Sequence, residues 1–306
     1  MVNISLRTFL YPRYWYAWPI LAFVRITSWL PNYILWILGN TLGSFFSWFQ
    51  SPARRVAERN IDLCFPEMGP QERRKLVKKH LRLSGYAVVS LAVAWWAPKW
   101  RIRSFIKFRD QHHLDDAIAS GKNVILLAPH FIGLDMGGMR LSIERKAVSM
   151  YRQSRNPLLE YIFQRRSRFD GVVVERMSNL KALLRYIRQG LPFYYLPDQD
   201  MGERASVFAP FFGVPAATVT ALSRIAQSTN AVVIPCITRI LPKGHGYEMR
   251  LYPPLKNFPS DDPLDDSRRM NEEVEKRVRE MPEQYMWSYR RFKTRPNNEP
   301  SLYDKK

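Results

Sequence analysis

From residue 121 onward, short apolar runs rich in β-branched and aromatic residues alternate with stretches of helical periodicity. The apolar runs lie at 123–128, 146–151, 171–175, 191–197 and 231–240. The helical patterns between them cover 132–145, 157–169, 178–189 and 216–229. Strands that are apolar throughout are typical of a parallel sheet with both faces covered. The alternation therefore predicts an α/β fold in which a mostly parallel sheet is flanked by helices.

Two further helices and one strand extend this pattern. A long helix is predicted between Pro70 and Pro98, because proline favours the first turn of a helix and the position just beyond its end. The sequence GYEMRLYPP (246–254) predicts an edge strand, and the polar segment 263–282 predicts a C-terminal helix. Residues 297–306 are expected to form a flexible tail.

The N-terminal region resembles a membrane-associated segment. No charged residue occurs between Ile26 and Ala53, and a bilayer crossing takes about 20 apolar residues. Pro31 and Asn32 dilute this run, whereas tryptophans, which favour the membrane interface, recur through it and just before it. These tryptophans are Trp15, Trp18, Trp29, Trp36 and Trp48. We expect a membrane anchor that either spans the bilayer or lies in its interface; the alternative is a pair of helices packed on the globular domain.

These patterns divide the chain into four parts. Residues 1–53 are expected to form the N-terminal membrane anchor region, and residues 54–120 a helical connecting segment packed on the catalytic domain. Residues 121–296 are expected to form the α/β domain that carries the chemistry, and 297–306 the tail.

Charge and cysteine usage narrow the class of partner. The chain has 47 Lys and Arg against 27 Asp and Glu, a formal net charge of +20, which indicates anionic partners such as acidic lipid, phosphorylated substrate or acidic protein. Nucleic acid is disfavoured, because no zinc-finger spacing, RNA-binding sheet signature or leucine zipper occurs. The 2 cysteines and 5 histidines show neither a disulfide framework nor metal-ligand spacing. We therefore expect no metal and no cofactor.

One short stretch carries a candidate for catalysis. In NVILLAPHFIGLD, His130 follows the end of a predicted buried strand, and Asp135 follows five positions later at the start of a predicted helix. Ligands of parallel sheets gather at the carboxyl ends of the strands, and Asp198 also follows such an end. A carboxylate that accepts from one imidazole nitrogen raises the basicity of the other. Since no GxSxG elbow occurs, the pair suggests direct attack of a substrate hydroxyl on an activated acyl group.

The residues around this stretch resemble a known family. HFIGLD matches the HxxxxD/E motif of lysophospholipid- and glycerol-phosphate-type acyltransferases. Four further blocks resemble the late acyltransferases of lipid A biosynthesis, the HtrB/MsbB or LpxL/LpxM type: RNIDLCFPEM, YRQSRNPLLE, PDQDMGERASVFAPFFG and PEQYMWSYRRFKTRP. The resemblance extends from about Arg13 to Pro296 and implies a glycerol-phosphate acyltransferase-like form of the fold. The lipid A members more often have glutamate where this chain has Asp135.

The resemblance implies roles for particular residues. His130 would be the general base and Asp135 its orienting partner. Arg166 and Asp198 match a family arginine and a family carboxylate, and Arg176 and Arg204 are further candidates for substrate binding. Guanidinium groups suit an acceptor that carries phosphates and carboxylates. The segment VFAPFFG (207–213) is expected to be an apolar loop that either lines an acyl tunnel or packs in the core.

The implied reaction moves a fatty acyl chain from acyl carrier protein to the 3-hydroxyl of an acyl chain on a Kdo-bearing lipid A precursor, without a covalent acyl-enzyme. It would take place at the inner (cytoplasmic) membrane, with the catalytic domain on the cytoplasmic face. One alternative is a related membrane acyltransferase whose acceptor is another glycolipid or a lysophospholipid. The other is a basic peripheral membrane or nucleic-acid-binding protein with an incidental His–Asp pair.

Overall fold

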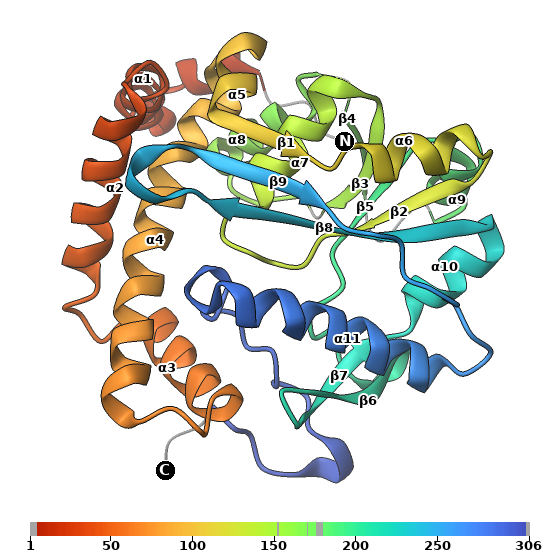
Figure 1. Cartoon of the computed structure of the whole chain (residues 1–306). Helices are drawn as coiled ribbons and strands as arrows, with labels where there is room; N and C mark the ends of the chain where they lie inside the picture. The colour runs from red at the N-terminus through yellow and green to blue at the C-terminus, as the bar shows by residue number, and fades with distance from the viewer. Residues whose placement is uncertain (1–4, 152, 170, 176–179, 304–306) are drawn as a thin grey trace.

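The predicted alternation of strands and helices forms a seven-stranded sheet flanked by helices (Figure 1). This computed structural model describes residues 5–151, 153–169, 171–175 and 180–303. The strand order is β1-β9-β8-β2-β5-β3-β4, and every neighbouring pair is parallel except β8 with β9. The strands are β1 (Ile106–Arg109), β2 (Asn123–Leu127), β3 (Ala147–Tyr151), β4 (Gly171–Glu175), β5 (Phe193–Tyr195), β8 (Ala231–Ile240) and β9 (Tyr247–Leu251). The predicted α/β class is confirmed.

The centre of the sheet brings two distant stretches of sequence together. β2 lies between β8 and β5, and its residues Val124–Leu127 are buried because both faces of the sheet are covered. Since β2 and β5 run parallel, the residues that follow them emerge at the same edge. This adjacency places the segments beginning at Pro129 and Leu196 side by side.

The helices occupy most of the predicted positions. They are α1 (Ala17–Thr27), α2 (Asn32–Phe46), α3 (Pro52–Cys64), α4 (Pro70–Trp96), α5 (Lys99–Phe105), α6 (His112–Ala119), α7 (Leu134–Glu144), α8 (Pro157–Gln164), α9 (Leu180–Arg188), α10 (Ala221–Thr229) and α11 (Pro263–Glu280). The prolines at 70 and 98 flank α4 as predicted, with Pro70 in its first turn.

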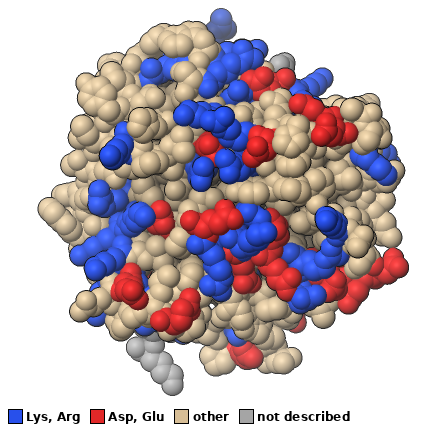
Figure 2. Space-filling view, in the orientation of Figure 1, with Lys and Arg blue, Asp and Glu red and all other residues tan. Residues whose placement is uncertain are grey.

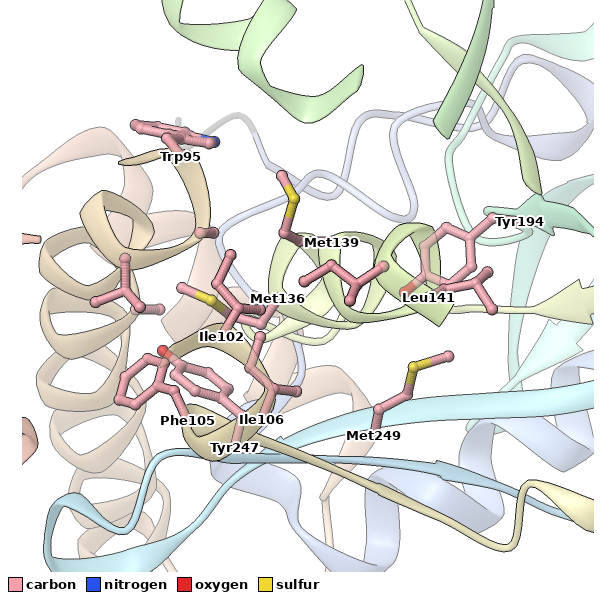
Figure 3. Packing of buried hydrophobic residues seen from close by; sticks show 14 of the residues in the cluster. Trp95, Ile102, Phe105, Ile106, Met136, Met139, Leu141, Tyr194, Tyr247 and Met249 are labelled. Carbon is pink, nitrogen blue, oxygen red and sulfur yellow. The ribbon is translucent and has the colours of Figure 1, made fainter. Parts of the chain in front are cut away.

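Helix α7 lies at the heart of the larger core. Its residues Met136, Met139 and Leu141 pack among side chains from α5 and β9 (Figure 3). A Cβ atom added at Gly137 would clash with Thr238 of β8, so this position requires glycine for α7 to lie so close to the sheet. The close packing fixes the N-terminus of α7 at the edge where β2 ends.

The N-terminal helices pack on α4 through one face and expose the other. A Cβ atom at Gly85 of α4 would clash with the backbone at Gly39 and Gly43 of α2, so the two helices meet backbone to backbone. The outer side, which we call the N-terminal apolar surface, exposes large apolar side chains: Leu6, Leu10, Tyr11, Trp15, Tyr16, Trp18, Ile20, Phe23, Ile26, Trp29, Tyr33, Ile37, Leu38, Leu42, Phe45, Phe46, Trp48 and Phe49. None of the helices in the described part of the chain combines the length and apolarity that a bilayer crossing requires.

Three details of the predicted elements are wrong. β9 is an inner strand, because the unpredicted β1 pairs along its free side. The segment predicted as a helix from 216 begins as a strand: β6 (Ser206–Phe211) and β7 (Val214–Val219) form an antiparallel hairpin, and helix α10 starts after it. Most of VFAPFFG is therefore a strand, whose Phe211 packs in a second core beneath α11.

Candidate active site

His130 lies in the turn that joins β2 to α7. Pro129 ends the strand segment, and the ring of His130 is 12% exposed. The next residue, Phe131, is fully buried and pairs with Tyr285 in an isolated β-bridge. The backbone next to the imidazole is thus held by the C-terminal segment.

Asp198, which follows β5, is the carboxylate that holds this imidazole. His130 Nδ1 donates to Asp198 Oδ1 at 2.6 Å, and the His130 backbone N–H donates to Oδ2 at 2.9 Å. Tyr285 Oη donates to the same Oδ2 at 2.8 Å. Asp198 is 3% exposed, so its three hydrogen bonds replace solvent almost entirely.

The electrostatics of Asp198 favour its ionised form. Burial by itself raises the pKa of this carboxyl, but attraction to His130 and the hydrogen bonds from His130 and Tyr285 outweigh it, so the pKa is lowered. The pKa of the Tyr285 hydroxyl is raised well above its ordinary value by burial and by the Asp198 charge. Tyr285 therefore stays a neutral donor, and the carboxylate remains available to stabilise a protonated imidazole.

The segment that includes Tyr285 closes the site from the C-terminal end of the chain. The Met286 N–H donates to the His130 carbonyl at 2.8 Å, and the Ile132 N–H donates to the Gln284 carbonyl at 2.9 Å. The Tyr289 ring stacks with the His130 ring, with centroids 6.4 Å apart. These residues lie in PEQYMWSYRRFKTRP, which the family resemblance marked as a block without pointing to a particular side chain.

The second ring nitrogen of His130 is the one that can act as a base. Because Nδ1 faces a carboxylate, Nδ1 carries the proton and the lone pair of Nε2 can accept a hydrogen bond. The amide of Gln199 donates to His130 Nε2 at 3.1 Å. A substrate hydroxyl would have to take the place of this amide in order to transfer its proton to the ring.

A cavity of about 120 Å³ lies beside this edge of the sheet. Its lining comes from α7, β3, β4, β5 and the 3-10 helix η3 (Arg165–Ser167), and most of it is apolar. Asp135 and Gly138 contribute to the α7 wall, and Ala147 to Tyr151 form the β3 wall along the whole strand. Since β3 runs about 3.3 Å per residue, the cavity follows the sheet for roughly 13 Å. An elongated apolar group suits this shape.

His130 and Asp135, which the sequence predicted as a pair, have different surroundings in the structure. Asp198, expected in substrate binding, is the carboxylate that accepts from His130 Nδ1. The physical reason is the adjacency of β2 and β5, which brings Asp198 to the imidazole. Asp135 lies in the first turn of α7 and lines the cavity. A catalytic role for Asp135 stays a prediction.

The three predicted arginines lie in different parts of the chain. Arg166 lies in η3, whose neighbouring residues Gln164 and Ser167 line the cavity. Arg204 is exposed in a short 3-10 helix that precedes β6. Arg176 lies outside the described residues. Substrate binding by these arginines stays a prediction.

No three His, Cys, Asp or Glu side chains gather around a possible metal position within the described ranges. Cys64 and Cys236 are both buried free thiols. Burial raises the pKa of each thiol, which makes the nucleophilic thiolate form unfavourable. An acid–base group, His130, near an apolar cavity is therefore the candidate for the chemistry of this site.

Comparison with known proteins gives consistent results along the whole chain. A family model described as bacterial lipid A biosynthesis acyltransferase matches residues 3–294. The lipid A biosynthesis lauroyltransferase of Escherichia coli is 35% identical over 96% of both chains. The palmitoleoyltransferase of that organism is 31% identical over 97% of both chains, and its myristoyltransferase is 31% identical over 98% of this chain and 94% of the relative.

Among solved structures, an acyltransferase of Thermotoga maritima that acts on 1-acyl-sn-glycerophosphate, PlsC, aligns over 79% of this chain and 97% of its own. Its TM-score is 0.37 at 16% sequence identity, and we draw nothing from a likeness of this size.

Proposed function

The chain belongs to the bacterial lipid A biosynthesis acyltransferase family, and we propose that it moves a fatty acyl chain from acyl carrier protein to the 3-hydroxyl of an acyl chain on a Kdo-bearing lipid A precursor. That it is an acyltransferase of lipid A biosynthesis rests on the family. The donor, the acceptor and the mechanism are our proposal. The observation that carries the mechanism is the imidazole of His130, held by Asp198 at the edge of the sheet where Asp135 and Leu196 line an apolar cavity.

In the proposed reaction, the acceptor hydroxyl displaces the Gln199 amide and hydrogen-bonds to His130 Nε2. Its oxygen forms a bond to the carbonyl carbon of the donor thioester while its proton passes to Nε2. The carbon–sulfur bond then breaks, and the imidazolium returns the proton to the leaving thiolate. Asp198 stabilises the imidazolium that exists between these two transfers, because its ionised form is favoured in the buried site.

The cavity is proposed to hold the acyl chain of the donor. Asp135 lines it at the edge of the sheet where the strands end, and its far end is lined by Ala147 and Ser142, where α7 approaches the beginning of β3. Phe163 and Leu196 add apolar surface to its walls. The three Escherichia coli relatives are named for three different acyl chains, so their names do not fix the chain that this cavity accepts.

The N-terminal apolar surface is proposed to lie in the interface of the inner membrane, with the active site facing the cytoplasm, where acyl carrier protein is found. Trp48 is 77% exposed and Phe23 67% exposed, and aromatic side chains of this kind favour the level of the lipid headgroups. Burying such side chains in lipid contributes about 1.5–3 kcal/mol for each one that is fully removed from water. The exposed surface on α1 and α2 supports attachment by this face.

Purified protein with acyl-loaded carrier protein and a defined Kdo-bearing precursor provides the test. Mass spectrometry should show one acyl chain added to the precursor, and His130→Ala should abolish the addition. Parallel reactions offer a lysophospholipid or another glycolipid as the acceptor. Transfer to one of those acceptors with an unmodified precursor would refute the proposed acceptor, and undiminished transfer by His130→Ala would refute the general base.

A further inference from the structure

A group of five basic side chains gathers where α4 ends. Arg25 comes from α1, Lys99 and Arg101 come from α5, and Arg165 and Arg168 come from η3 and the residue after it. We call these five residues the cationic cluster. Figure 1 shows α1 and α5 near one another at the upper end of α4.

Direct contacts tie the members of the cluster to one another. Arg165 Nε donates to the Trp95 carbonyl at 3.1 Å, and Arg168 donates to the Ala97 carbonyl, at the C-terminus of the same helix. Lys99 Nζ and the Arg168 guanidinium both lie over one aromatic ring, that of Phe169, at 5.3 Å and 4.4 Å.

The remaining two members approach from the N-terminal helices. Arg101 donates to the Leu30 carbonyl in the turn between α1 and α2. Arg25 lies over the ring of Trp29, one residue earlier, at 5.4 Å. The cluster is therefore a single site built from three segments of the fold.

This cluster lacks the acidic partners that basic residues have elsewhere. On α11, Arg268 pairs with Asp265 and Glu272, and Arg277 pairs with Glu273 and Glu280. Figure 2 shows basic and acidic side chains intermixed over much of the visible face. Within the described part of the chain, none of the five cluster cations lies within ion-pair distance of a carboxylate.

The positive charge of the cluster is only partly balanced by the fold. The C-terminus of α4 supplies about half a negative charge to Arg165 and Arg168, which is far less than the five positive charges present. The pKa of Arg168 is lowered to about 10, first by burial and then by repulsion from Arg165 and Arg25. Burial also lowers the pKa of Arg101. The protonated forms therefore repel one another in a partly desolvated place, and an anion would remove that cost.

The surroundings identify the kind of anion. Trp29 is 50% exposed and Trp100, next to Lys99, is 63% exposed, so the cluster borders the N-terminal apolar surface. Tryptophan beside arginine and lysine is the arrangement found at the headgroup level of membranes. Guanidinium groups bind phosphate oxygens in pairs of hydrogen bonds, and lysine binds phosphate as a point charge.

We propose that the cationic cluster binds the phosphate group of a lipid whose chains lie along the N-terminal apolar surface. The inference rests on the proposed attachment of this surface to a membrane and names the headgroup chemistry that it recognises. Two lipids carry such a phosphate: a phospholipid of the membrane and the acceptor itself. The cluster also shares η3 with the cavity wall at Ser167, so a bound phosphate would stiffen that wall.

The test removes two exposed cations of the cluster that do not cap a helix. Arg25→Gln combined with Lys99→Gln is compared with Lys256→Gln combined with Lys276→Gln, which removes equal charge from exposed sites on and near α11. Binding is measured to phosphatidylcholine vesicles that contain either phosphatidylglycerol or, at equal surface charge, oleate. Each basic residue near an anionic surface contributes roughly fivefold to affinity, so the cluster variant should lose about 30-fold.

Three results would overturn the proposal. They are unchanged affinity of the cluster variant for phosphatidylglycerol vesicles, an equal loss by the control variant, and equally tight binding of the unaltered protein to oleate vesicles. A second arm measures transfer in neutral detergent without phospholipid. A raised KM for the acceptor in the cluster variant assigns the site to the acceptor's phosphate, whereas an unchanged KM with weakened vesicle binding assigns it to a phospholipid.

The second arm also separates this proposal from the proposed function. If the unaltered protein transfers no acyl chain in neutral detergent, the proposed reaction fails, while the vesicle measurements still decide whether the cluster binds a lipid phosphate.

Discussion

Replacing Asp198 by asparagine should move the ring proton of His130 from Nδ1 to Nε2. In the native site, Asp198 Oδ2 accepts from the His130 N–H and from Tyr285, and Oδ1 accepts from His130 Nδ1. The oxygen of an asparagine satisfies two donors best at the Oδ2 position, which leaves its NH₂ group facing Nδ1. Two donors cannot bond to each other, so Nδ1 must lose its proton and Nε2 must gain it.

The expected loss of activity follows from this change of the His130 tautomer. With Nε2 protonated, His130 cannot accept the proton of an acceptor hydroxyl, and general base catalysis contributes typically 10²–10⁴-fold. We therefore expect kcat of Asp198→Asn to fall by about 10²–10⁴-fold. The free energy of unfolding should fall by about 1–3 kcal/mol, because one charged acceptor of a buried network becomes neutral.

Asp200→Asn is the matched control. Asp200 is also buried and also accepts three hydrogen bonds, from the Gly202 N–H and from the N–H and hydroxyl of Thr294, yet it does not contact the imidazole. Acyl transfer gives kcat for both variants, urea unfolding gives their stability, and the ¹⁵N shifts of the ring report the tautomer. A native kcat in folded Asp198→Asn, or an equal fall of kcat in Asp200→Asn, would show that the Asp198 carboxylate does not set the tautomer needed for catalysis.

Three further changes probe the site and the fold. Gln199→Ala should speed hydrolysis of the acyl donor in the absence of acceptor, because water then reaches Nε2 of the base; an unchanged rate would show that the amide does not shield it. Ala147→Phe should shift donor preference toward shorter acyl chains by filling the far end of the cavity, and competition between donors of different length checks this. Burial lowers the pKa of His80 from 6.5 to about 4 in the folded protein. As the pH falls from 6.5 to 4, the unfolded chain therefore takes up a proton on His80 that the folded protein does not, and the free energy of unfolding falls by about 3 kcal/mol. Urea unfolding at several pH values should show this slope in the native protein and a smaller one in His80→Gln, whose amide can still donate to the Glu283 carbonyl.

The hydrophobic pattern predicted most of the sheet because its strands are buried on both faces. The runs at 123–128 and 231–240 contain few polar residues and became β2 and β8. The hairpin of β6 and β7 escaped prediction because it lies outside this sheet and the prolines and glycine within it are typical of a loop.

The residues near His130 in the sequence do not indicate that Asp198 accepts its hydrogen bond. The sequence predicts Asp135 as the partner because it lies five residues after His130. Asp198 reaches the imidazole through the pairing of β2 with β5. Strand order depends on the packing of the whole sheet and leaves no mark on the residues of one strand. Tyr285 was missed for the same reason, since it meets Asp198 across 87 positions of sequence.

The C-terminal segment around Tyr285 has a consequence for the order in which the site forms during synthesis of the chain. During synthesis His130 and Asp198 leave the ribosome before Gln284 and Met286, which bond to the backbone of the His130 turn from near the C-terminus. A chain that ended before residue 284 would lack both of these backbone hydrogen bonds and the Tyr285 hydroxyl that donates to Asp198. All the hydrogen bonds around His130 are therefore present only in a chain that extends at least to residue 286.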